Sequence, residues 1–349
     1  MSAKFEFGCL PTAIGSMPQI DPDEANSIVM KYLPDIPAWP QLPERSSNET
    51  MCAQVSEGFP GVVIDEGKIY IGPSANLDAE LKQIYVDCEQ NNYDKYAIST
   101  EYAAGLHAFL SKVTEAEMVK GQMAGPITWG LTVADQDGRA ILCNDTLAEA
   151  MAKFLKLKAM WQENALRKIS RSAIMVIDEP SLVLLSSTFL YVPQERVRIP
   201  NEKVAALLQE VLNGIEGVKG MHCCGGTNWA LPLSTTIDVL SFDTYNYASS
   251  FARYPDEVKS FLKRGGTIAW GIVPNTEEAL AGESVSSLRD RLEEAMAPFT
   301  RDGIRFKQIL RQSLLTPSCG LAGLSPEAAC QALELVANLS HYLRERYTI

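Results

Sequence analysis

A histidine and a cysteine stand two residues apart in the stretch 220–226, which reads Gly-Met-His-Cys-Cys-Gly-Gly. The preceding run, 214–221, is rich in β-branched residues and bounded by glycines, which favours a short buried strand over a helix. Side chains alternate along a strand, so His222 and Cys224 share one side and Cys223 faces away. An imidazole beside a thiol is half of a tetrahedral zinc site. The alternative is a strand end with cysteines packed in the core and a hydrogen-bonded histidine.

The elements that must position this pair form a repeating pattern along the chain. Strand-like apolar segments lie near residues 12, 38, 120, 173, 218, 238, 268 and 314, and most are separated by helical patterns. This alternation predicts a single (β/α)8 barrel, of the TIM type, as one catalytic domain over residues 1–349. Two alternating runs about an acidic-glycine turn predict a β-hairpin inserted at residues 62–71. The glycine-rich motifs of nucleotide-binding sheets are absent.

The carboxyl ends of barrel strands gather at one rim, where TIM-barrel chemistry takes place. Three of the expected strands end in metal-binding residues: His222 with Cys224, then Asp243, then Cys319. One histidine, two cysteines and a carboxylate match zinc, and an exchangeable carboxylate leaves the open position that a catalytic zinc needs. We interpret the other six of the eight cysteines as packing residues.

Two further strand ends offer groups for a small zwitterion. Asp178 and Glu179 follow the apolar run 172–177, and an anion at the barrel mouth would bind an ammonium group. The alternative is an acid pair that binds loop amides. Ser16 and the amides around Gly15 could bind a small carboxylate, although Gly-Ser at a strand end is also ordinary turn chemistry.

Composition excludes several classes of partner. The chain has 349 residues, of which 46% are hydrophobic, and a formal charge of −12. A strongly acidic protein repels phosphate backbones and anionic lipid, so we expect no nucleic acid and no membrane as partner. The first ten residues lack the apolar core of a signal peptide, and no run reaches membrane-spanning length, so we expect a cytoplasmic protein. In a reducing compartment scattered cysteines favour free thiols or metal ligands over disulfides.

These motifs resemble, over nearly the whole chain, the family of cobalamin-independent methionine synthase and uroporphyrinogen decarboxylase-like barrels. The likeness is to the methionine synthase branch, and there only to its C-terminal catalytic barrel. The motifs that carry it, in the family's order, are residues 13–19 (Ala-Ile-Gly-Ser-Met-Pro-Gln), 125–128 (Gly-Pro-Ile-Thr), 177–180 (Ile-Asp-Glu-Pro), His222-x-Cys224 and 317–320 (Pro-Ser-Cys-Gly).

The resemblance implies one zinc ion per chain, bound by His222, Cys224 and Cys319. It also implies homocysteine as substrate, with its carboxylate on Ile14-Gly15-Ser16 and its amino group on Asp178. The family's fourth metal ligand is a glutamate, and Asp243, one methylene shorter, stands at that position.

The departures from the family concern the folate that donates the methyl group. The family's folate-stacking tryptophan aligns near Thr132, and Trp129 is displaced from that position. A folate-contacting glutamate is replaced by Leu184. The proton-donating histidine is replaced by the segment 272–275, which reads Ile-Val-Pro-Asn. Methyl transfer from the folate nitrogen needs a general acid, whereas a methylcorrinoid releases cobalt(I) without a proton. The sequence therefore predicts a methylcorrinoid donor on a separate corrinoid protein, as in single-barrel, folate-independent members of the family.

Three other functions stay open. The acceptor could be coenzyme M or another thiol, although Asp178 would repel a sulfonate. A uroporphyrinogen decarboxylase-like lyase needs a basic cluster near the N-terminus, where Lys4 is the only lysine or arginine before Lys31. A barrel with a structural zinc and a binding role would hold its metal in a closed site.

Overall fold

The structure is a computed structural model that describes residues 5–114, 116–186, 190–192, 195–197, 199–301 and 303–349; Lys4 lies outside this part. The strands are β1 (Leu10–Pro11), β2 (Val62–Asp65), β3 (Lys68–Ile71), β4 (Ala116–Ala124), β5 (Ser170–Asp178), β6 (Leu190–Val192), β7 (Glu195–Val197), β8 (Val218–Cys223), β9 (Val239–Phe242), β10 (Thr267–Val273) and β11 (Ser313–Pro317). The helices are α1 (Pro22–Tyr32), α2 (Met51–Ser56), α3 (Leu77–Glu89), α4 (Ala104–Lys112), α5 (Pro126–Thr132), α6 (Asp145–Arg167), α7 (Asn201–Leu212), α8 (Ala230–Ser234), α9 (Thr244–Phe251), α10 (Pro255–Lys263), α11 (Glu277–Ala281), α12 (Val285–Arg301), α13 (Phe306–Arg311) and α14 (Pro326–Tyr347).

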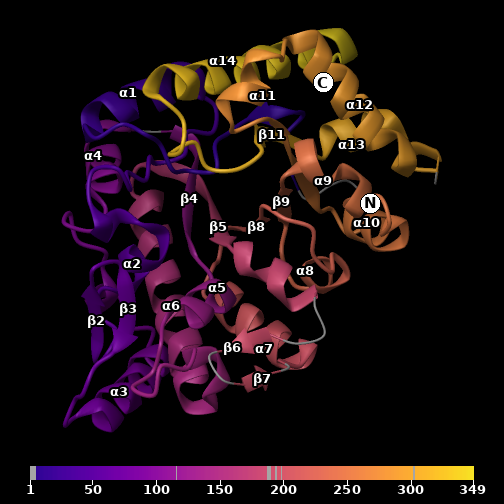
Figure 1. The fold of residues 1–349 in the computed structure, drawn as a ribbon. Coiled ribbons are helices and arrows are strands. Elements are labelled where there is room, and N and C mark those ends of the chain that lie inside the picture. Colours follow the sequence, from indigo (N-terminus) through magenta and orange to yellow (C-terminus); the bar gives the residue numbers. More distant parts are fainter. Residues whose placement is uncertain (1–4, 115, 187–189, 193–194, 198, 302) are drawn as a thin grey trace.

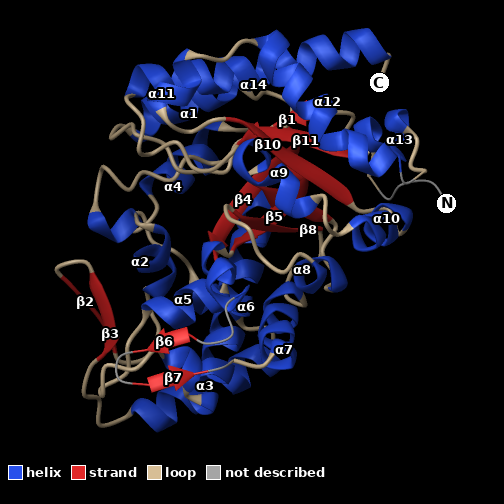
Figure 2. Ribbon diagram, turned by 45° about the vertical axis from the view of Figure 1, so that its right-hand side comes forward, coloured by secondary structure: helices blue, strands red, loops and turns tan. Residues whose placement is uncertain are grey.

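Seven strands form one parallel sheet in the order β1-β11-β10-β9-β8-β5-β4. The strands lie in the centre of the molecule, with helices around them (Figure 2). Parallel strands buried on both faces read as continuous apolar runs, which is why the sequence located them. The sheet is a curled barrel of the β/α kind that stays open between its edge strands β1 and β4, so the expected eight-stranded ladder is not complete.

The eighth position is held by the extended stretch 37–41, which forms isolated bridges instead of a strand. Ala38 pairs with Lys120 of β4, and Gln41 pairs with Ser16 beyond β1. Pro37 and Pro40 have no N–H to donate, so a continuous hydrogen-bond ladder cannot form there. The expectation of an eighth strand near residue 38 was correct about its place and wrong about its regularity.

Two apolar clusters stabilise this arrangement. The larger one lies between the sheet and the helices around it, and the smaller one fills the interior of the curled sheet with residues such as Ile174, Val176, Val218 and Leu314. Nearer the carboxyl ends of the strands, the buried polar residues Gln122, Asp178, His222 and Ser241 follow this apolar cluster. The smaller apolar cluster fills the amino-terminal part of the interior, so these polar residues face the carboxyl rim.

The hairpin expected at residues 62–71 is present as β2 and β3, with Asp65 opposite Lys68. Glu66 and Gly67 between them have φ values of 46° and 80°, the two left-handed residues that a tight hairpin turn requires. The hairpin lies at the edge of the molecule near α2 and α3 (Figure 1) and projects outward in the turned view (Figure 2). Ile71 N–H donates to Ala134 O in the loop after α5.

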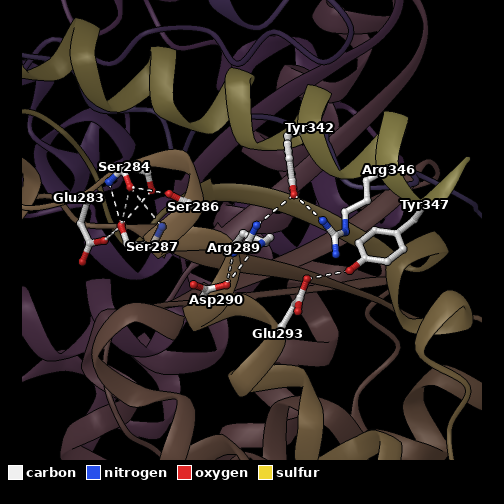
Figure 3. Close-up of polar contacts among 10 residues, drawn as sticks. All are labelled: Glu283, Ser284, Ser286, Ser287, Arg289, Asp290, Glu293, Tyr342, Arg346 and Tyr347. Carbon is white, nitrogen blue, oxygen red and sulfur yellow. Dashed lines mark hydrogen bonds and ion pairs between the residues drawn. The ribbon is translucent and has the colours of Figure 1, made fainter.

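On the opposite side of the molecule, α12 and α14 are joined by polar contacts (Figure 3). Arg289 of α12 donates to the Tyr342 hydroxyl at 3.0 Å, and the Tyr347 hydroxyl donates to Glu293 at 2.7 Å. No helix in the described part of the chain is long and apolar enough to span a bilayer.

Candidate metal centre

Three polar residues form a row across adjacent strands at the carboxyl rim. Asp178 ends β5 and pairs with His222 of β8, which in turn pairs with Ser241 of β9. Paired residues of neighbouring strands point to the same face of a sheet. The row therefore directs a carboxylate, an imidazole and a hydroxyl to the same rim of the interior.

Two cysteines complete a compact group with the histidine. The ligand atoms of His222, Cys224 and Cys319 all lie within 4.8 Å of one another, and no other group of this kind occurs among the described residues. Cys224 is the first residue beyond β8, and Cys319 is the second beyond β11. Cys223 is fully buried on the other side, with its Sγ 3.7 Å from Gly225 O. The alternation expected from the sequence therefore holds across the end of the strand.

The two ring nitrogens of His222 have different surroundings. Nδ1 lies 2.9 Å from Ser241 Oγ, whereas Nε2 is buried and has no hydrogen-bond partner. Buried polar atoms are nearly always paired, so the unpaired Nε2 is a donor atom suited to bind a metal ion. Zinc-binding histidines typically bond their second nitrogen to a neighbouring group, as Nδ1 does here. This orphaned nitrogen and the donor set of two sulfurs and one nitrogen both fit zinc.

The cysteine pair is electrostatically suited to bind a cation. The hydrogen bond from Cys224 lowers the pKa of Cys319, burial opposes this effect, and the neighbouring His222 lowers the pKa further. The same hydrogen bond, together with burial, raises the pKa of Cys224. The lowered pKa of Cys319 favours its thiolate, which is the form that binds a metal.

Asp243 does not join this compact group. Its Oδ1 accepts from Asn246 N at 2.9 Å and its Oδ2 from Asn246 Nδ2 at 2.8 Å, because Asp243 is the N-cap of α9. Both carboxylate oxygens are therefore already engaged with α9. Its assignment as the fourth ligand stays a prediction.

A cavity of about 280 Å³ opens next to the three ligands. The residues that line it come from the rim of the sheet and from the segments before and within α2: Ile14, Ser16, Gln41, Pro43, Thr50, Met51, Asp178, Pro180, His222, Cys224, Cys319, Gly320, Ala322 and Gly323. The substrate residues expected from the sequence, Ile14, Ser16 and Asp178, therefore share one cavity with the metal ligands, with Gly15 between the first two.

The two neighbouring acids after β5 have different roles. Glu179 accepts hydrogen bonds from Ile127 N at 2.9 Å and from Thr128 N and Thr128 Oγ1, both at 2.7 Å, so it fixes the start of α5. Asp178 lines the cavity, and its Oδ1 has no hydrogen-bond partner. Burial raises the pKa of Asp178 to about 6, against the attraction of Lys120 and His222. The loop-amide interpretation thus holds for Glu179, and Asp178 is placed for a ligand.

The segment Ile14-Gly15-Ser16 lies close to the loop that carries Cys319. A side chain on Gly320 would collide with Ser16 Oγ, and Leu321 N donates to Ser16 O at 2.9 Å. Gly15 has φ 145°, and a Cβ there would collide with the side chain of Gln122. Gly15 is therefore required by its own backbone conformation and by Gln122, whereas Gly320 leaves the space that the Ser16 hydroxyl occupies.

Sequence reasoning missed several residues of the site. Ser241 gives no signal in spacing, because its role depends on the register between β8 and β9. The cavity residues Thr50 and Met51 belong to a loop and a short helix that no motif connects to the rim. Lys120 did carry a signal, since it is the one charged residue within the otherwise uncharged stretch 118–124 of β4.

Two solved structures share this fold. A B12-independent methionine synthase from Shewanella sp. W3-18-1, solved in complex with selenomethionine, has a TM-score of 0.56 and 15% identity and aligns over 97% of this chain and 98% of its own. A methyltransferase from Methanosarcina mazei has a TM-score of 0.57 and 14% identity and aligns over 95% of this chain and 94% of its own. No protein-family model matches the chain, and no curated protein matches its sequence. At these identities, the likeness establishes a shared fold with the two solved structures.

Proposed function

We propose that this protein is a zinc-dependent thiol methyltransferase that transfers a methyl group from a protein-bound methylcorrinoid to L-homocysteine, giving methionine. One observation carries the proposal. The donor atoms of His222, Cys224 and Cys319 converge within 4.8 Å, and His222 and both cysteines line the cavity that Asp178 and Ser16 also line. Both structural neighbours are named as enzymes of methyl transfer, which supports the same reaction class.

Zinc fits the three ligands, and Asp243 or an exchangeable group would supply the fourth. Zinc bound there supplies Lewis acidity, which lowers the pKa of a substrate thiol so that a thiolate persists at neutral pH. The protein itself holds the imidazole in one orientation through Ser241. It also leaves the three ligands accessible from the cavity.

The groups that face the cavity favour an amino-acid thiol. Asp178 presents a buried carboxylate oxygen without a hydrogen-bond partner, which suits a substrate ammonium group. The segment Ile14-Gly15-Ser16 lies on the same cavity and would receive the carboxylate. The Shewanella enzyme was solved with selenomethionine, an analogue of the methionine expected as product here. An anionic sulfonate of the coenzyme M kind would instead be repelled by Asp178.

The surroundings of the cavity support a donor without folate. Trp129 is fully buried, and its Nε1 donates to Ser56 Oγ at 2.7 Å, so its ring cannot stack on a ligand. His222 is the one histidine among the cavity residues. His107 of α4 bonds Ile98 O, and His341 is exposed on α14. The site thus lacks a spare imidazole to protonate a leaving nitrogen.

The proposed reaction balances without such a proton donor. The homocysteine thiol releases its proton to solvent, the thiolate sulfur forms a bond to the methyl carbon, and the cobalt–carbon bond breaks. Its electron pair stays on the corrinoid as cobalt(I). The remaining task of the chain is orientation, since aligned reactants avoid much of the entropic cost of a bimolecular step.

The decisive assay offers the zinc-quantified protein homocysteine with methylcobalamin and, in parallel, with methyltetrahydrofolate. Methionine formed with methylcobalamin alone supports the proposal. Turnover with the folate alone would overturn the donor assignment. Coenzyme M in place of homocysteine tests the acceptor, and equal turnover with it would overturn the amino-acid assignment.

A further inference from the structure

A lysine is buried inside the curled sheet beneath the cavity. Lys120 of β4 is 4% exposed, and its Nζ donates to Ile14 O at 2.6 Å and to Gln122 Oε1 at 3.1 Å. Hydrogen bonds from a charged donor are about twice as strong as neutral ones. The ammonium group therefore ties β4 to the segment that begins the expected carboxylate site.

Gln122, which accepts a hydrogen bond from Lys120, packs against the same segment. Gln122 Nε2 donates to Trp39 O at 2.9 Å, and its side chain lies where a Cβ on Gly15 would stand. Gln162 Nε2 also donates to Gln122 O at 3.3 Å. These side chains link β4 to the stretch 37–41 and to Ile14, at the opening between β1 and β4. They add to backbone bonds that are already there, from Trp39 N to Lys120 O at 3.3 Å and from Gln41 N to Gly15 O at 3.0 Å.

The positive charge of Lys120 has its counterpart on the adjacent strand β5, nearer the carboxyl rim. Asp178 is the charged group that attracts Lys120, and Lys120 is the largest attraction on Asp178. Burial lowers the pKa of Lys120 to about 8, against the attraction of Asp178. Burying an ammonium without a close carboxylate is costly. The interior thus holds a positive group bonded to Ile14, which lines the cavity, and a negative group, Asp178, that lines the same cavity.

We propose that Lys120 is a positioning residue for the substrate pocket: it holds the Ile14–Ser16 backbone in its binding conformation and sets the preference for a zwitterionic amino-acid thiol. This inference rests on the proposed function and adds the group that creates the charge selectivity. Lys120 itself does not line the cavity, so it acts through Ile14 and through the field that it shares with Asp178.

The test compares two ligands on the zinc-loaded protein by isothermal titration calorimetry. L-Homocysteine carries both charges, and 1-propanethiol is the same thiol without them. Lys120→Met removes the charge and the bond to Ile14. Lys158→Met is the matched control, because Lys158 is also fully buried but its Nζ has no hydrogen-bond partner and it does not line the cavity.

In Lys120→Met the affinity for homocysteine should fall by at least about 10-fold, while that for 1-propanethiol and the zinc content stay at the wild-type level. Lys158→Met should keep the wild-type ratio. An unchanged ratio in a folded, zinc-loaded Lys120→Met overturns the inference, and so does an equal loss of both affinities. If Lys120→Met does not fold, Lys120→Gln, which stays polar but loses the charge and the reach, gives the same comparison. A wild-type protein that does not prefer homocysteine would instead refute the proposed function itself.

Discussion

His222 and Ser241 are direct neighbours across β8 and β9, and Ser241 Oγ lies 2.9 Å from Nδ1 of the imidazole. With Nδ1 bonded, the lone pair of Nε2 is the one available to a metal. The strand register thus sets the orientation of the imidazole, and Nε2 carries the lone pair when Nδ1–H donates to this hydroxyl.

Ser241→Ala should lower zinc affinity by about 10- to 100-fold without removing a ligand, since partners of metal-binding histidines have effects of this size. Competition with a chromophoric chelator measures it. Thr316→Val is the control, because the buried Thr316 hydroxyl has no hydrogen-bond partner. Wild-type affinity in Ser241→Ala would show that the hydroxyl does not orient the ligand.

Asp178→Asn should raise the KM for homocysteine by about 10-fold or more and leave zinc content unchanged, because the ammonium group loses its carboxylate partner. Steady-state kinetics with saturating methyl donor, together with metal analysis, checks this. An unchanged KM would remove Asp178 from the substrate site.

Glu179→Ala should destabilise the fold by about 2–4 kcal/mol, because three donors at the start of α5 lose their common acceptor. Urea unfolding measures the difference. Glu277→Ala, which removes an exposed carboxylate bonded to Ser325 N, should cost much less than Glu179→Ala. Equal costs for the two variants would contradict the structural role of Glu179.

Lys158→Met should stabilise the protein at pH 7 by about 1–3 kcal/mol. Burial lowers the pKa of Lys158 from 10.5 to about 8, so below pH 8 the folded state carries the full cost of a buried ammonium. Between pH 8 and 10.5 the unfolded chain binds more protons, so the wild type gains stability and the advantage of the variant shrinks. Denaturant unfolding at pH 7 and pH 10 tests the trend, and a constant or growing advantage would contradict it.

The sequence was sufficient where local rules decide the structure. Alternation along a strand separated Cys223 from His222 and Cys224, and the turn at Glu66 and Gly67 located the hairpin. Continuous apolar runs predicted the buried parallel strands. These features depend on a few neighbouring residues, so they can be read without knowing what lies opposite.

The remaining features depend on partners far along the chain. The role of Ser241 follows from the register of two strands, and Lys120 gains its role from Ile14, more than one hundred positions earlier. Asp243 stands at a strand end as expected, but it also begins α9, and both of its oxygens bond Asn246. The position of Asp243 at the rim could be predicted from the sequence. That Asn246 already binds both of its carboxylate oxygens could not.

The most direct test of the metal-centred account is the variant Cys319→Ser, assayed for bound zinc and for homocysteine methylation, with Cys223→Ala as the control. Cys319 is one of three convergent ligands, whereas Cys223 is a buried neighbour on the opposite side. Cys319→Ser should fold, lose its zinc and lose methyl transfer, while Cys223→Ala keeps one zinc per chain and its activity. Full methyl transfer by a metal-free Cys319→Ser protein would contradict the account.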